Sequence, residues 1–140
     1  MLSLELARKL AEAGLTWTPR EHDTFVIPDA GMDQKMFSIG DLQTSVQPYF
    51  GVQHIMFHGT SEWALDQVMV EEAVWIPSET QLRLAIEERI PDTTYILERQ
   101  TEGYRCSVAG VSDHGAVYQS AEDAYASALL ALIGSTTKSA

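Results

Sequence analysis

The chain has 140 residues, and its 20 acidic residues outnumber its 9 basic residues, which gives a net charge of −11. This charge argues against nonspecific binding to nucleic acid and to anionic membranes, because both need positive charge to neutralise phosphate groups. A single cysteine, Cys106, excludes an intrachain disulfide and suits a reducing compartment. No segment approaches the ~20 apolar residues that span a bilayer, and the N-terminus lacks the pattern of a signal peptide. We therefore expect a cytoplasmic protein.

The N-terminal half of the sequence predicts a helix followed by an antiparallel meander. Ser3 is a suitable cap for a helix to about residue 13, where Gly14 favours the left-handed conformation that ends helices. Runs of β-branched and aromatic residues between turn residues then predict strands. These strands cover residues 24–27, 35–39, 42–47 and 52–57, with Pro48 closing the third.

The second half predicts three helices and a hairpin. Thr60 or Ser61 caps a helix over 62–72, and an extended segment at 74–76 follows it. Ser78 and Gln81 form a capping box for a helix that ends near residue 89. Strands at 95–99 and 104–108 form a hairpin, and 116–118 is a candidate third strand. The last helix begins after Ser120.

Together these elements predict a single compact α+β domain over residues 1–134. Its antiparallel sheets are packed by three to four helices, and residues 135–140 form a frayed polar tail. A chain of this length buries enough surface to hold a core without disulfides or metals.

The segment His58-Gly59-Thr60-Ser61 is the candidate ligand-binding site. It resembles the His-Gly-Thr strand of ADP-ribosyltransferases, in which the His holds the ribose of NAD. The resemblance implies an NAD- or nucleotide-binding enzyme with His58, Thr60 and Ser61 at its pocket. The structural interpretation is that Gly59 turns the chain after a strand and Ser61 caps the next helix. We favour the structural interpretation, because no other residues complete a catalytic set.

We predict neither a metal site nor a bound cofactor. His54 and His58 are the closest pair of histidines along the chain. On a strand they would stand about 13 Å apart, whereas zinc ligands lie about 2 Å from the metal. Cys106 shares one face of a predicted strand with Tyr104 and Val108, which indicates a buried, inert thiol.

Trp63 and Trp75 are the candidate partner-binding residues, because they lie near the two ends of the predicted helix over 62–72 and tryptophan is enriched at interface hot spots. The favoured function is a non-catalytic protein-binding or assembly module that self-associates, with a homodimer expected. Its partners are proteins, and neither nucleic acid nor membranes are expected.

Three stretches of the chain resemble a family of small bacterial and phage-encoded proteins of unassigned function, some of which carry a pilus-assembly label. These stretches are 4–15, 75–78 before a Leu-rich helix, and 120–125 at the start of an Ala/Leu helix. The resemblance implies a compact α+β domain and no particular activity. The C-terminal hairpin and helix are also similar to antitoxin domains of the HicB type.

Overall fold

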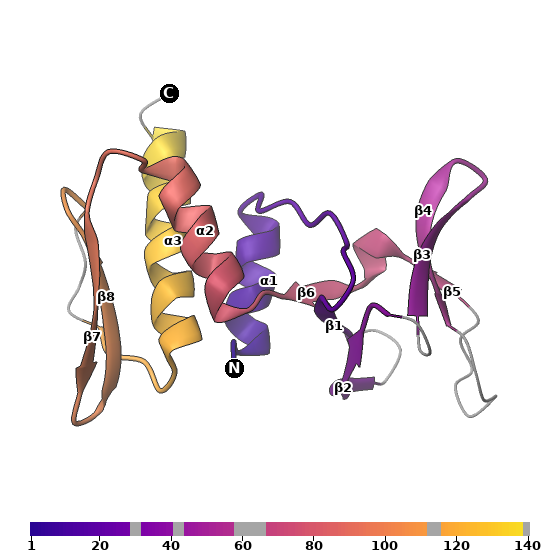
Figure 1. Ribbon diagram of the computed structural model, residues 1–140, viewed down its shortest axis with the longest axis horizontal. Coiled ribbons are helices and arrows are strands. Elements are labelled where there is room, and N and C mark those ends of the chain that lie inside the picture. Colours follow the sequence, from indigo (N-terminus) through magenta and orange to yellow (C-terminus); the bar gives the residue numbers. More distant parts are fainter. Residues whose placement is uncertain (29–31, 41–43, 58–66, 112–115, 139–140) are drawn as a thin grey trace. The chain divides into compact units, whose positions relative to one another are not determined.

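The computed structural model describes residues 1–28, 32–40, 44–57, 67–111 and 116–138. It confirms the α+β class, with α-helices and antiparallel strands (Figure 1). The chain divides into two compact units: residues 1–16 together with 77–140, and residues 17–76. The α-helices of the described part of the chain all belong to the first unit, whereas strands dominate the second. A single domain over 1–134 stays a prediction.

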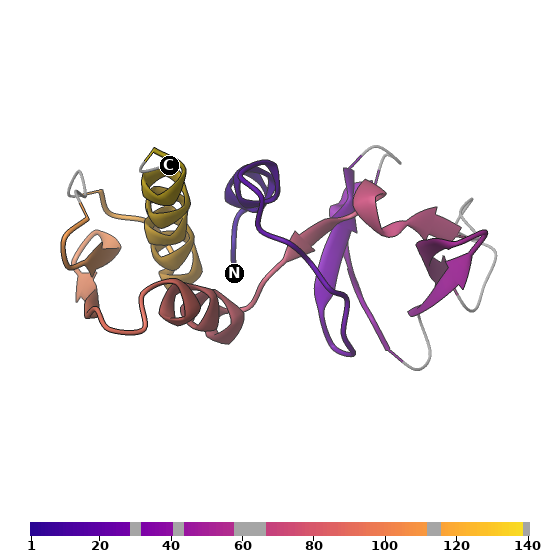
Figure 2. The same cartoon turned by 90° about the horizontal axis from the view of Figure 1, so that it is seen from above.

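The first unit contains the helices α1 (Leu4–Glu12), α2 (Glu79–Arg89) and α3 (Ala121–Lys138). Helix α3 packs against α1, α2 and strand β8 (Gly103–Val108), so it lies between the hairpin over 95–108 and α1 (Figure 2). The caps predicted at Ser3 and Ser78 are confirmed. Ser3 Oγ accepts from the Leu6 N–H, and Ser78 and Gln81 bond reciprocally at the start of α2. These bonds satisfy amides that the first turn leaves without helical partners.

Helix α3 extends further than the sequence predicts. Its backbone is helical through Lys138, where a frayed tail from residue 135 was expected. The buried stripe that includes Leu129, Leu132 and Ile133 anchors the preceding turns. Once these turns form, each added residue gains a backbone hydrogen bond without a new nucleation cost, so the helix continues past its apolar part.

Strands β7 (Tyr95–Gln100) and β8 (Gly103–Val108) form the predicted hairpin. Gly103 has φ +146°, and a Cβ at this position would collide with the carbonyl oxygen of Tyr118. Glycine is therefore required here by both the backbone and the space. The candidate third strand at 116–118 is only an isolated bridge, in which Tyr104 and Tyr118 exchange two backbone hydrogen bonds of 2.7 Å.

The second unit consists of two three-stranded antiparallel sheets. The first has the order β2 (Met32–Ser38), β1 (Thr24–Ile27), β6 (Val74–Ile76), and the second has the order β3 (Thr44–Tyr49), β4 (Val52–Phe57), β5 (Gln67–Met69). The strands do not form the single meander that the sequence predicts for the N-terminal half, because β1 and β2 belong to one sheet and β3 and β4 to the other. Strand β6 returns from later in the chain to pair with β1. Both sheets contribute to one buried core, made by Phe25, Ile27, Phe37, Ile39 and Ile55.

The helix predicted over 62–72 is wrong for residues 67–72. Residues 67–69 form β5, which pairs with β4 so that Val68 lies opposite Ile55, and Val70–Glu72 form a short 3₁₀ turn, η2. Val70 then packs on the core. Pairing with β4 therefore overrides the local helix preference, as tertiary contacts commonly do. Strand β3 also runs through Pro48, which an edge strand tolerates because it needs no donor on its open side.

Candidate protein-binding site

Most of the site residues predicted from the sequence lie outside the described residues. These are the ligand-binding candidates His58, Thr60 and Ser61 and the partner-binding candidate Trp63. Trp75 is described and lies in β6. The fully buried Ile55 of β4 confirms that the strand leading to His58 faces the core at this position.

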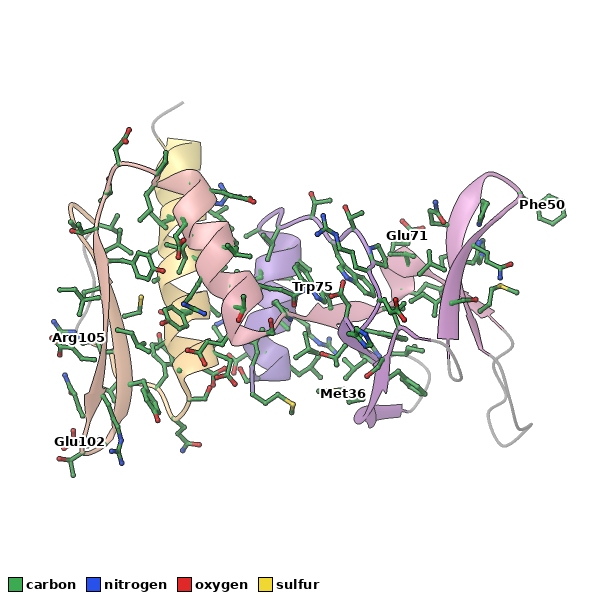
Figure 3. The ribbon with its side chains drawn as sticks, in the orientation of Figure 1. Met36, Phe50, Glu71, Trp75, Glu102 and Arg105 are labelled. Atoms are coloured by element: carbon green, nitrogen blue, oxygen red, sulfur yellow. The ribbon has the colours of Figure 1, made fainter. Side chains whose placement is uncertain are left out.

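Trp75, which is labelled in Figure 3, is half-buried. It belongs to an aromatic cluster of the second unit. Its Cα pairs with that of Phe25, and its indole stacks on Trp17 with the ring centroids 6.2 Å apart. The Trp17 Nε1–H donates a 2.9 Å hydrogen bond to the buried carboxylate of Asp23. Trp75 Nε1 has no hydrogen-bond partner among the described residues. This packing gives Trp75 a structural role, while its role in binding a partner stays a prediction.

A different feature of the second unit is open to solvent. Residues 47–53, which we call the β3–β4 arm, form the outer part of the β3–β4 hairpin. Consecutive residues at 47–48 and at 52–53 are exposed. Because successive side chains of a strand point to opposite faces, both faces of the arm meet solvent. The hairpin is anchored further in, where Val46 lies opposite the buried Ile55.

Phe50 stands at the tip of the β3–β4 arm, and Figure 3 shows its ring directed away from the strands. Its exposed fraction is 89%, and that of Val52 is 45%. Phe50 and Gly51 have φ values of +51° and +78°, the combination of a type I′ turn, which favours Asn, Asp or Gly. A bulky residue in the left-handed region costs about 1–2 kcal/mol. Phe50 therefore costs stability without burying its ring.

The β3–β4 arm is also free of charge. No Asp, Glu, Lys or Arg occurs from residue 42 to residue 61, although the whole chain has a net charge of −11. The second unit has nine acidic and two basic residues, a net charge of −7, and all of them lie outside this stretch. Charged residues are depleted at the centres of protein interfaces, where aromatic residues are enriched. The arm has the composition of such a centre.

The first unit contains a partly exposed polar cluster around Tyr95. Tyr95 Oη donates a 2.5 Å hydrogen bond to Glu87 Oε2, and the Tyr95 ring meets Tyr125 edge to face at 6.3 Å. Burial raises the pKa of Tyr95 to about 12, and the hydrogen bond and negative charge of Glu87 add to this effect. Burial also raises the pKa of Tyr125. Such phenols stay protonated near neutral pH, so Tyr95 acts as a hydrogen-bond donor between β7 and α2.

In the part of the chain that the structure describes, no three His, Cys, Asp or Glu side chains gather in a way that could hold a metal ion. None of the helices described is both long enough and apolar enough to cross a membrane. Comparison with protein-family models, with curated proteins and with solved structures gives no match. The resemblances suggested by the sequence stay predictions.

The β3–β4 arm is a candidate site that the sequence analysis missed. The sequence does contain a sign of this site. Phe50-Gly51 separates two predicted strands, at the turn positions where hairpins favour Asn-Gly. The exposure of Phe50 depends on where the shared core ends, which only the tertiary structure gives.

Proposed function

We propose that the protein is a cytosolic, non-catalytic protein-binding module whose β3–β4 arm inserts Phe50 into an apolar pocket of a protein partner. The observation that carries this proposal is the exposed Phe50 ring on a turn position that penalises it. Single exposed apolar residues are common on protein surfaces. Phe50 differs from them because its left-handed backbone conformation costs free energy and because the arm around it carries no charged residue. The buried Cys106 as sole cysteine suits a reducing compartment.

The charge of the second unit defines the chemistry of the partner. The arm is neutral, while the residues around it in the sequence carry the net charge of −7. A pocket that accepts Phe50 and is rimmed by Lys or Arg would complement both properties. Rim charges chiefly raise the association rate, and salt screens them. We therefore expect the association rate to fall with salt, while the dissociation rate depends mainly on Phe50.

Site-specific photo-crosslinking tests the proposal in cells. Benzoylphenylalanine replaces Phe50 in one variant and, as the matched control, Arg8 in another, because Arg8 is exposed on α1 of the first unit. We expect a discrete crosslinked protein from position 50 that is absent from position 8. Identical product patterns from the two positions would contradict the proposal.

The crosslinked partner is then purified for affinity measurements. Phe50→Asn should weaken its binding by at least about 30-fold, the effect of losing a hot-spot side chain of about 2 kcal/mol. Asn suits the left-handed turn position, so the variant keeps the hairpin intact. An unchanged dissociation constant for Phe50→Asn would refute the role of the ring.

A further inference from the structure

The sheet of the first unit has two edges, and a further backbone bridge among the described residues lies on one of them. Strand β7 pairs with β8, and β8 is bridged on its other side by Tyr118. Beyond β7 no further strand is paired among the described residues of the sheet. Two strands alone form a marginal sheet, and an open edge offers backbone groups to another strand.

The hydrogen-bond pattern identifies the backbone groups on the open edge. The Thr94 C=O accepts from the Ala109 N–H, so even-numbered residues of this strand direct their backbone groups toward β8. Tyr104, which lies opposite Arg99, directs its own groups away from β7 toward Tyr118. It follows that Tyr95, Leu97 and Arg99 direct their N–H and C=O groups outward from the hairpin.

Exposed apolar side chains lie on β7 itself and on helix α2, which is hydrogen-bonded to it. Ile96 is 60% exposed and lies on the face of β7 opposite to Tyr95. Leu84 is 53% exposed and precedes Glu87 by about one helical turn. Since Glu87 accepts the hydrogen bond of the Tyr95 hydroxyl, Leu84 lies on the flank of α2 that is close to β7. These two residues are the large exposed apolar residues of α2 and β7.

We propose that β7 is a self-association surface, on which a second copy of this chain adds its own β7 antiparallel about a two-fold axis through Leu97. This register pairs Leu97 with Leu97 of the second copy and Tyr95 with Arg99 of the second copy. It uses all three outward-pointing residues of each strand, and each such pair exchanges two hydrogen bonds. The result is a continuous four-stranded sheet.

Hydrogen bonding and charge favour this register over its two neighbours, because a two-fold axis through Ile96 would leave the outward groups of Arg99 without a partner in β7. Arg99 is exposed and makes no ion pair with the described residues of its own chain. In the proposed dimer its guanidinium lies beside Tyr95 of the other copy, whose hydroxyl binds the carboxylate of Glu87. A shift to the next two-fold register would place Glu98 opposite Glu98, where like charges repel. Neither contact involves the β3–β4 arm, so this inference and the proposed function can fail independently.

Sedimentation velocity of the full chain over a wide concentration range tests the dimer. We expect a monomer–dimer equilibrium in the wild type. Arg99→Glu should weaken it at least tenfold, because it places a carboxylate beside Glu87 of the other copy. Arg99→Pro should do the same, since it removes an outward N–H that β8 does not use. The matched control is Arg8→Glu, which makes the same charge change at an exposed position of α1.

Three outcomes would overturn the proposal: a wild type that is monomeric throughout, a dimer that survives Arg99→Glu and Arg99→Pro, or a dimer that Phe50→Asn abolishes. Hydrogen exchange gives a second readout that does not depend on mutation. The amides of Leu97 and Arg99 should become more protected as the wild-type concentration rises, while those of β8 stay constant. Equal protection at all concentrations would contradict an edge-to-edge dimer.

Discussion

The indole rings of Trp17 and Trp75 stack with their centroids 6.2 Å apart and their planes 7° apart. Trp17 precedes the first strand of the second unit and Trp75 belongs to its last strand, β6. The pairing of β1 with β6 brings the two together. Asp23 fixes the Trp17 ring, because its buried carboxylate accepts from the indole N–H and from the Arg20 backbone N–H. The stack therefore joins the beginning and the end of this unit.

The Trp17–Trp75 stack should be measurable as a coupling energy. We expect Trp17→Ala and Trp75→Ala each to lower the free energy of unfolding by about 2–3 kcal/mol, below the range for fully buried tryptophans because both are half-buried. The double variant should lose about 0.5–1.5 kcal/mol less than the sum, which is the coupling of an aromatic pair. Urea unfolding of the wild type, the two single variants and the double variant gives this double-mutant cycle. Strictly additive losses would show that the stack contributes nothing beyond burial.

Gly103 should be among the least replaceable glycines of the first unit. Gly103→Ala introduces a Cβ that collides with the Tyr118 carbonyl oxygen, and it also places alanine at φ +146°. Gly110→Ala is the matched control, since Gly110 has φ +80° but open space around it. We expect a loss of about 1 kcal/mol for Gly110→Ala from the backbone alone, and at least about 2 kcal/mol more for Gly103→Ala. Equal losses of stability for Gly103→Ala and Gly110→Ala in thermal unfolding would mean that the backbone at Tyr118 moves aside at little cost.

Phe50→Asn should leave the fold as stable as the wild type or more stable. Asn tolerates the left-handed conformation that Phe50 adopts at φ +51°, and little buried surface is lost because the ring is exposed. We expect a gain of up to about 1 kcal/mol in the free energy of unfolding. Val52→Asn, outside the left-handed turn positions, is the control and should give no gain. A marked destabilisation by Phe50→Asn would show that the ring packs on the hairpin and is not displayed.

The Tyr95–Glu87 hydrogen bond should make stability depend on pH in the alkaline range. The pKa of Tyr95 is raised from 10.0 to about 12 in the folded protein, so the folded state holds this proton more tightly than the unfolded state. The resulting stabilisation is complete below pH 10 and is lost as the pH rises through about 12. We expect the free energy of unfolding to fall across this window, by less than about 1.4 kcal/mol per pH unit because solvent reaches the cluster.

Two variants test whether the Tyr95–Glu87 pair causes the fall in the free energy of unfolding at alkaline pH. Tyr95→Phe removes the titrating group and should flatten the Tyr95 contribution, and Glu87→Gln should reduce it, since an amide carries no charge that opposes the phenolate. Urea unfolding from about pH 9 to about pH 12 gives the slope for each protein. A wild-type slope that persists unchanged in Tyr95→Phe would show that another group causes it.

Local signals in the sequence predicted much of the fold. The caps at Ser3 and Ser78, the hairpin at 95–108 and the strands at 24–27 and 52–57 follow from turn chemistry and residue preference, which act within a few residues. The segment at 67–72 was mispredicted because its state depends on pairing with β4. The division of the strands into two sheets with a shared core likewise depends on contacts distant in sequence.

The sequence by itself determined the α+β class, the excess of negative charge and the absence of charge from residue 42 to residue 61. The tertiary structure decided which apolar residues are buried and which are displayed. Trp75 is stacked on Trp17 while Phe50 is exposed, although both are aromatic residues in predicted strands or turns. The physical reason is that burial depends on where the core ends, and a core is built from strands that pair across the chain and not from neighbours within it.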